Sequence, residues 1–392
     1  MLLKMFQFRS KFVQCLDIIW RHIPHKLSSC AVTLATFAFG ITCKGEWVVV
    51  AIHLFRQFGF LPENIPSNSS FTSEEFTFEN ISLESLHLHG LFTMWIVCNL
   101  IGFLVYFSIG GFLHWHYYLK QKDKPNLWKC QPTKWLSAEL ERHEILFGSL
   151  SLLCVDTVTS VFATYIKNGG WSMVYYQFDE YTWMWYFLQW PVIFIYQDYV
   201  TYWLHRMYHT PWLYRKFHKA HHRYVQPTAF SVTAIHPVEI VHIQLTLALP
   251  LFTIPTHWTS FTCIGFYTYY HGIIDHSGID FKAPWWQPWR PDTIFHDNHH
   301  QYFHVNFGFN CYYWDILHDT YRRRDRIYKE DIFYGRGKPI AEATSKEIEE
   351  EVKSRESENI NAHRYINPIL NTSELIEEDK RGGGKFTEAV IS

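Results

Sequence analysis

Three short histidine clusters constrain the fold of this chain more than any other feature of its sequence. Residues 205–304 hold 14 of the 24 histidines, and eight of these lie in His205-Arg-Met-Tyr-His209, His218-Lys-Ala-His221-His222 and His296-Asp-Asn-His299-His300. Residues three and four positions apart share one face of a helix, so each cluster is expected to present its imidazoles in one direction. Three such faces that converge would supply eight nitrogen donors, which is too many for one metal ion and enough for two.

The number of clustered histidines favours metal binding over ordinary packing. A lone histidine in an aromatic-rich chain is usually a core or surface residue with one hydrogen bond. Eight imidazoles buried together without a ligand would leave nitrogens unpaired, at a cost on the order of 1–3 kcal/mol each. A structural zinc needs only four ligands, so eight predict two ions, and open positions on paired ions indicate catalysis. Imidazole suits zinc, copper, iron and nickel alike, so the clusters do not choose the metal.

Other histidines extend this candidate site. His276, within Asp275-His276-Ser277-Gly278, follows the last apolar stretch and is predicted to be a ninth ligand. His236 and His271 are left open as further ligands. Structural roles are expected for the three remaining histidines of this region, which are His242, His257 and His304.

Two acids lie close to the clusters. Asp198 precedes His205 by two helical turns on the same face. It is predicted to accept a hydrogen bond from a ligating imidazole and so fix its tautomer, with a charged residue reaching toward the helix end as the alternative. Asp297 lies off the face shared by the third cluster, so it is interpreted as a hydrogen-bonding neighbour of the ligands or as an exposed acid.

Apolar segments predict an integral membrane protein. Residues 91–113 carry no charge and are long enough to cross a hydrocarbon core of ~30 Å. Residues 145–166 and 181–204 predict two further spans, each with one aspartate. Residues 241–274 contain two prolines and predict two half-crossings or a hairpin that re-enters from one side, and residues 30–55, interrupted by Lys44 and Glu46, predict an earlier crossing.

The charged residues predict how these segments are oriented. Lys and Arg gather at the N-terminus, after the 91–113 span and after the 181–204 span. Positive segments stay cytoplasmic, so all three histidine clusters are expected to face the cytoplasm. The sequons at Asn68 and Asn80 would then be lumenal, where glycosylation requires them. The first residues lack the arrangement of a cleaved signal peptide.

Composition divides the chain into three parts. Residues 1–86 are expected to form an N-terminal arm, a first span and a lumenal loop. Residues 87–335 form the membrane domain with the histidine clusters at 205–300, and residues 336–392 a charged tail that is disordered apart from a short charged helix. A net charge of −2 gives no indication of nucleic-acid binding, and the eight scattered cysteines without a C-x-x-C indicate neither a disulfide framework nor a zinc–cysteine site.

At these residues the chain resembles the fatty acid hydroxylase and sterol desaturase superfamily of membrane non-haem diiron oxygenases. The resemblance covers about residues 134–324 and includes the three clusters in this order and spacing. Ile235-His-Pro-Val-Glu239 is similar to the sterol C5-desaturase branch and Asp275-His-Ser-Gly278 to the cholesterol 25-hydroxylase branch. The chain departs from the family at Asp319, where a glycine usually precedes Thr320.

The resemblance implies about four transmembrane helices or hairpins under a cytoplasmic helical cap, in the endoplasmic reticulum. It implies two iron ions, molecular oxygen, and electrons from NAD(P)H through cytochrome b5 and its reductase. The substrate would be a sterol or related lipid that is hydroxylated or desaturated. Residues of this chain that match the family's ligands are His205, His209, His218, His221, His222, His276, His296, His299 and His300.

Three other functions are weighed against this one. A fatty-acyl or sphingolipid hydroxylase of the same superfamily would share every motif above. A histidine-rich metal transporter needs ionisable residues along a path across the bilayer, whereas here they gather at one face. An inactive scaffold derived from the enzyme family is disfavoured because no cluster histidine is missing.

Overall fold

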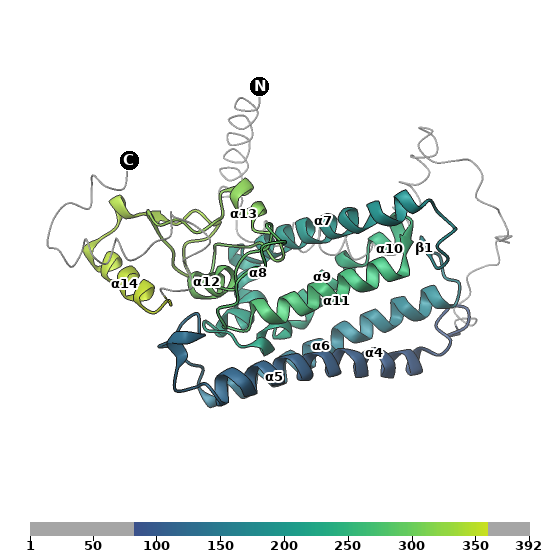
Figure 1. Ribbon diagram of the computed structural model, residues 1–392, viewed down its shortest axis with the longest axis horizontal. Helices are drawn as coiled ribbons and strands as arrows, with labels where there is room; N and C mark the ends of the chain where they lie inside the picture. Colours follow the sequence, from purple (N-terminus) through teal and green to yellow (C-terminus); the bar gives the residue numbers. More distant parts are fainter. Residues whose placement is uncertain (1–81, 360–392) are drawn as a thin grey trace, which may run out of the picture. The chain divides into compact units, whose positions relative to one another are not determined.

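The computed structural model describes residues 82–359, and residues 1–81 and 360–392 lie outside this description. The described chain is mostly helical, with two small sheets of two strands each. Long helices run side by side, and shorter elements gather at one end of them (Figure 1). We call these shorter elements, residues 209–236 and 276–359, the cap. The predicted helical class is confirmed, while the predicted crossing at 30–55 and both sequons lie outside the described residues.

The two long apolar helices contain the first two predicted spans. One helix, 91–119, is built from α4 (Leu91–Val105), the π segment η2 (Tyr106–Gly110), α5 (Gly111–Leu113) and a second π segment, η3 (His114–Leu119). The other is α6 (Ala138–Lys167), capped by Ser137. Within residues 82–359 these are the only helices long and apolar enough to cross a membrane. Leu104 is 67% exposed and Leu146 is 72% exposed, as expected of residues that face lipid rather than a protein core.

The third predicted span, 181–204, is also a helix but a more polar one. It forms α7 (Trp183–Tyr208), which Thr182 caps by accepting a hydrogen bond from the backbone N–H of Trp185 at 3.3 Å. Its inner face buries Gln189, Gln197 and Asp198, so its composition falls short of a typical membrane span. The crossing by α7 therefore stays a prediction.

Residues 237–275 form a helical hairpin, and its re-entry into the membrane stays a prediction. The first arm is α9 (Pro237–Leu247) and the short α10 (Pro250–Thr253), and the return arm is α11 (Trp258–Asp275). The reversal is held by strand β2 (Thr256–His257), which pairs in parallel with β1 (Val174–Tyr175). Figure 1 shows α10 and β1 at the end of the long helices opposite the cap, so α11 returns the chain to the cap at His276.

Buried polar contacts on α6 fix the loop that precedes this hairpin. The carboxylate of Glu144 accepts hydrogen bonds from the backbone N–H and the hydroxyl of Thr228. Farther along the helix, Ser151 donates to the carbonyl of Ile235. The 3-10 segment η6 (Ala229–Thr233) lies between these two contacts and packs on both α6 and α11. Residues 228–235 are thus tied to a membrane helix at both ends.

Besides η6, the cap contains four short helical elements and an ordered C-terminal segment. The short elements are α8 (Pro211–Lys216), the 3-10 helix η5 (His218–Arg223), α12 (Ile294–Tyr302) and α13 (Tyr313–His318). The C-terminal segment holds strands β3 (Arg326–Ile327) and β4 (Lys338–Pro339), which pair antiparallel, then η7 (Ile340–Glu342) and α14 (Ser345–Glu356). A short 3-10 turn, η4 (Pro125–Leu127), joins the two long apolar helices.

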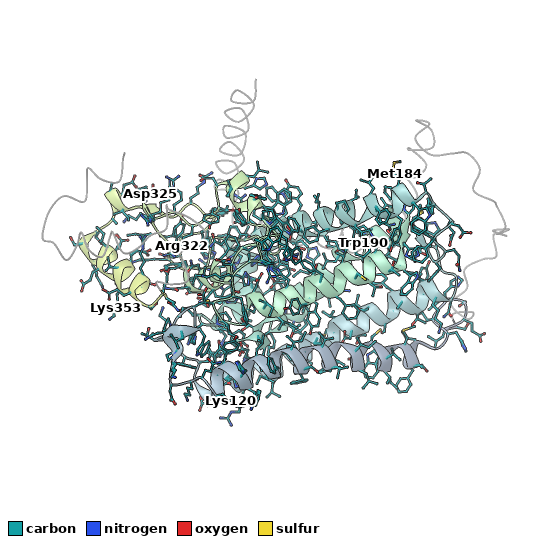
Figure 2. The ribbon with its side chains drawn as sticks, in the orientation of Figure 1. Lys120, Met184, Trp190, Arg322, Asp325 and Lys353 are labelled. Atoms are coloured by element: carbon teal, nitrogen blue, oxygen red, sulfur yellow. The ribbon has the colours of Figure 1, made fainter. Side chains whose placement is uncertain are left out.

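The expected disorder of residues 336–392 does not hold for residues 336–359. The charged helix is present as α14, which begins with a capping box between Thr344 and Glu347. Arg322 is buried against it, with its guanidinium 2.9 Å from Glu358 and 3.8 Å from the ring of Tyr302. In Figure 2 Arg322 lies within the cap, whereas Lys353 lies on the outer side of α14. The segment therefore packs on the rest of the cap through buried charge pairs, which cannot be recognised from its polar composition.

Replacing Arg322 with methionine should destabilise the protein markedly. The change removes one partner of the buried Arg322–Glu358 pair, and breaking such a pair typically costs about 3–5 kcal/mol. We expect the midpoint of thermal unfolding of the detergent-purified protein to fall by about 5 °C or more. Arg323→Met is the matched control, because Arg323 pairs with Asp325 on the exposed surface, where such pairs contribute little. Equal midpoints for the two variants would show that the buried pair does not hold the C-terminal segment.

Candidate metal centre

All nine predicted histidines converge where α7 meets the cap, as two adjoining groups. The first group contains His205, His209, His218, His222 and His299, and the second contains His221, His276, His296 and His300. Within each group the candidate ligand atoms all lie within 4.8 Å of one another. Every one of these side chains is buried. The structure therefore brings together the complete predicted set, in the two groups that two ions would need.

The local structure of each cluster decides which group its histidines join. His205 lies in the last turn of α7 and His209 caps its end, so both join the first group. The second cluster was expected on a regular helix that presents all three imidazoles to one side. It forms the 3-10 helix η5 instead, and its adjacent His221 and His222 diverge into different groups with ring centroids 5.6 Å apart.

The third cluster divides in the same way. On α12 the adjacent His299 and His300 also enter different groups, with ring centroids 5.7 Å apart. The H-x-x-H-H spacing was expected to give one shared face. Instead the paired histidines at its end let one short segment contribute to both groups.

Backbone carbonyls hold four of the imidazoles in one tautomer. The Nδ1 atoms of His205 and His299 lie 2.9 and 2.7 Å from the carbonyl oxygens of Phe307 and Val305. In the second group, His221 and His276 make the same contact with the carbonyls of Ala234 and Gly272, at 3.2 and 2.7 Å. A carbonyl can only accept, so each Nδ1 carries the proton and each neutral ring turns the lone pair of Nε2 toward its group.

Converging lone pairs suit the second group to binding a cation. The Nε2 atoms of His221 and His276 lie 3.3 Å apart, and neither ring in its neutral form has a proton to place between them. Burial lowers the pKa of His221 well below its ordinary value, and the His276 imidazole lowers that pKa further, so the neutral form persists at pH 7. Two facing lone pairs repel unless a cation lies between them. The arrangement therefore fits a bound metal ion.

Two further ligands of the first group are oriented by side chains. His218 Nδ1 lies 2.6 Å from a carboxylate oxygen of the buried Glu239. His209 Nδ1 lies 2.9 Å from Nδ1 of His304, whose Nε2 donates to the carbonyl of Glu330 at 2.6 Å. Because His304 donates through Nε2, its Nδ1 accepts from His209, and the lone pair of His209 Nε2 faces the group. Sequence reasoning missed both Glu239 and His304, since neither lies at a spacing that relates it to its partner.

The predicted role of Asp198 is wrong. Its two oxygens accept hydrogen bonds from the backbone and side-chain N–H groups of Asn310 and from the indole N–H of Trp314. None of these is an imidazole of the clusters. The analogous support comes from Asp315, which accepts from the backbone N–H groups of Phe307 and Gly308 and so fixes the segment whose carbonyl orients His205.

The remaining candidates lie outside both groups. His236 caps α9, accepting from the backbone N–H of Val238, and His257 caps α11 in the same way. His271 lies beside Asp275, with 3.2 Å between Nδ1 and the nearer carboxylate oxygen. Asp297 is buried and accepts from Gln131 rather than from a clustered imidazole, so the expected exposure of this acid is wrong. Neither residue left open in the sequence, His236 nor His271, joins a ligand group.

Unsatisfied nitrogens test whether these residues fit metal ions. His299 Nε2 and both ring nitrogens of His300 are buried without any hydrogen-bond partner. Each such group costs about 1–3 kcal/mol if nothing binds it. Groups of five and four imidazoles match the donor number and type that first-row transition metals such as iron accept. The residues present therefore fit two metal ions.

Removing His304 should weaken metal binding without removing a ligand. His304→Leu leaves the Nδ1–H of His209 without an acceptor, and loss of such a supporting partner typically weakens metal affinity about 10–100-fold. His304→Asn is the matched control, because its side-chain oxygen can still accept that proton. Metal content by mass spectrometry and the rate of metal loss to a chelator would measure the effect. Similar metal loss from both variants would argue against the orienting role.

Known proteins match the part of the chain that builds this centre. A family model described as fatty acid hydroxylase matches residues 190–320. The chain is 24% identical to the Delta(7)-sterol 5(6)-desaturase of Candida albicans, over 75% of this chain and 72% of that protein. It is 22% identical to a Delta(7)-sterol 5(6)-desaturase of Gibberella zeae, over 66% of this chain and 72% of that protein.

A shorter match has a higher sequence identity. A second desaturase of Gibberella zeae is 29% identical over 43% of this chain and 51% of its own length. No solved structure matches the chain. Together with the apolar helices 91–119 and 138–167, these matches confirm the resemblance that the histidine clusters indicated. Over residues 190–320 the chain is similar to the fatty acid hydroxylase family, and its similarity to sterol desaturases indicates an oxidoreductase.

Proposed function

We propose that this protein is a membrane-bound diiron oxygenase that desaturates or hydroxylates a sterol or a related lipid. The observation that carries the proposal is the pair of buried histidine groups, each with its candidate ligand atoms within 4.8 Å. Iron held there would activate molecular oxygen for attack on an unactivated C–H bond. The named relatives are sterol 5(6)-desaturases, which makes sterol desaturation the first reaction to test.

The protein's own part in this chemistry is to hold the ligands neutral, oriented and dry. Carbonyl acceptors fix the protonated Nδ1 of four imidazoles, and Glu239 fixes that of His218. All nine side chains of the two groups are buried, so bulk water is kept from the reacting carbon. Exclusion of water protects reactive species from side reactions and strengthens every charge interaction at the site.

The surroundings of the centre suit a substrate that arrives from the bilayer. The two groups sit where α7 and α11 end, next to helices whose outer faces are apolar. Phe187, Ile195 and Trp203 of α7 are each between 42% and 65% exposed, as lipid-facing side chains are. These contacts support lateral entry of an apolar molecule. A transporter would instead need ionisable groups along a path through the membrane helices.

Electrons are proposed to come from NAD(P)H through cytochrome b5 and its reductase. Four exposed basic side chains lie on α8 and η5, directly outside the second histidine cluster, and they are Arg215, Lys216, Lys219 and Arg223. This surface would suit a donor with an acidic docking face.

Expression in a yeast strain that lacks sterol C5-desaturase tests the proposal. We expect the wild-type chain to restore the 5(6) double bond and the purified protein to hold close to two irons. His221→Ala should abolish the activity and lower the iron content while the protein stays in the membrane fraction, because insertion depends on apolar helices outside the cluster. If the expressed protein instead adds a hydroxyl to a sterol, the protein is a hydroxylase. Oxidation of an acyl lipid alone would overturn the sterol assignment, and full iron in the variant would remove His221 from the ligand set.

We also propose that the cap faces the cytoplasm from the endoplasmic reticulum membrane. Lys120 and the lysines after it lie at the cap end of the first apolar helix, where positive residues are expected on the cytoplasmic side (Figure 2). We predict that Asn68 or Asn80 is glycosylated and that a C-terminal tag is digested by protease added outside intact microsomes. A protected C-terminal tag would reverse the orientation and exclude a cytoplasmic electron donor.

A further inference from the structure

A second set of buried polar atoms lies between α7, α11 and the cap, and neither ligand group uses it. None of these atoms has a hydrogen-bond partner in the structure. His271, Asp275 and Asn310 are each at least 98% buried. The unpartnered atoms are Tyr267 Oη, both ring nitrogens of His271, both carboxylate oxygens of Asp275, Asn310 Oδ1, Trp289 Nε1 and Arg290 Nε. We call these six residues the polar cluster.

Side chains of the polar cluster approach one another, as His271 approaches Asn310 and Tyr267 approaches Trp289, but the atoms named above are not aligned for hydrogen bonds. His271 Nδ1 lies 3.2 Å from Asp275 Oδ2, yet the two atoms are not aligned for a hydrogen bond. Asn310 is held from its other side by Asp198, which leaves Asn310 Oδ1 turned away from that bond. Buried polar atoms in folded proteins are nearly always paired, so a group of them left open at one place points to a ligand or water that completes the set.

The chemistry of the open atoms suits a neutral hydroxyl. Carboxylate and amide oxygens can accept its proton, and the indole N–H of Trp289 and the Nε–H of Arg290 can donate to its oxygen. A fatty-acid carboxylate would instead meet the carboxylate of Asp275 in a buried site. A lipid whose single polar group is a hydroxyl therefore fits better than a free acid.

The polar cluster lies next to the second histidine group. Asp275 directly precedes His276, and the ring of Phe309 contacts both sides, with centroids 6.2 Å from His271 and 6.4 Å from His296. Phe309 packs over Gly272, where an added Cβ would come within 2.8 Å of the ring. A substrate hydroxyl bound in the polar cluster would thus place carbons of the same ring system, rather than the far end of the molecule, at the histidines.

From this placement we propose that the polar cluster binds the hydroxyl of the sterol substrate and directs oxidation to carbons close to it. The inference rests on the sterol oxygenase function proposed above and adds the residues that recognise the polar end. In a 3-hydroxysterol, carbon 5 is separated from the hydroxyl-bearing carbon by a single carbon, whereas the side chain lies at the opposite end of the ring system. The polar cluster therefore favours oxidation in the first two rings over oxidation of the side chain.

Direct binding of sterols to the purified, iron-loaded protein tests this role. The probes are a radiolabelled Delta(7)-sterol and its 3-deoxy analogue, compared in wild type, Tyr267→Phe and His271→Leu. We expect wild type to bind the hydroxysterol at least about tenfold more tightly than the analogue, since a site built to pair a hydroxyl rejects a ligand without one. Both variants should lose most of that preference by weakening only hydroxysterol binding, with unchanged iron content.

Tyr269→Phe is the matched control. Tyr269 also has an unpartnered hydroxyl on α11, but its ring packs toward the core around Tyr106 and Phe230, away from the polar cluster. This variant should keep the wild-type preference. Equal binding of the two sterols by wild type, or equal weakening of both in the two variants, would overturn the hydroxyl site while leaving a sterol oxygenase intact. A wild-type protein that binds neither sterol and oxidises an acyl lipid would overturn the proposed function itself.

Discussion

The hydrogen bonds from imidazole Nδ1 to backbone carbonyls decide what the histidine centre can bind. Each bond places a proton on the outer nitrogen of a ligand and turns the inner lone pair toward its neighbours, as at His221 and His276. The carbonyls come from segments that are far apart in the chain, including Ala234 before the hairpin and Phe307 after α12. The imidazoles are therefore oriented for a metal ion only when the hairpin, η5 and the segment after α12 are all in place. Metal binding would thus depend on the fold of the cap.

The membrane helices contribute to this coupling through polar contacts. Glu144 and Ser151 of α6 hold both ends of residues 228–235, and the carbonyl of Ala234 in that loop orients His221. An acid and a hydroxyl on an otherwise apolar helix thus position a ligand they never touch. Buried polar groups of this kind are expensive to leave unpaired, so they also specify a single arrangement of the loop on the helix.

The sequence predicted that nine named histidines would converge, and it predicted the two long apolar helices and a helical hairpin over residues 241–274. Periodicity and spacing could not predict the division of each H-x-x-H-H cluster between two groups, because that depends on the 3-10 geometry of η5 and on where α12 lies against it. Asp198 was predicted to hydrogen-bond a ligating imidazole because it shares a helix face with His205. Instead it accepts from Asn310 and Trp314, which are more than 100 residues away in the sequence. Contacts at such separation leave no local signal in one sequence.

The structure explains why aspartate can replace the family's usual glycine at position 319. Asp319 ends α13 with φ 54°, in the left-handed region that glycine adopts most readily and aspartate tolerates better than most residues. The turn it makes lets Thr320 donate to Asp315 and lets the backbone N–H of Thr320 reach the same residue, and Asp315 in turn holds the segment whose carbonyl orients His205. Aspartate thus replaces the usual glycine as one of the few residues that can adopt the conformation of this turn. The contacts of Asp315 that orient His205 are preserved because the backbone conformation is preserved.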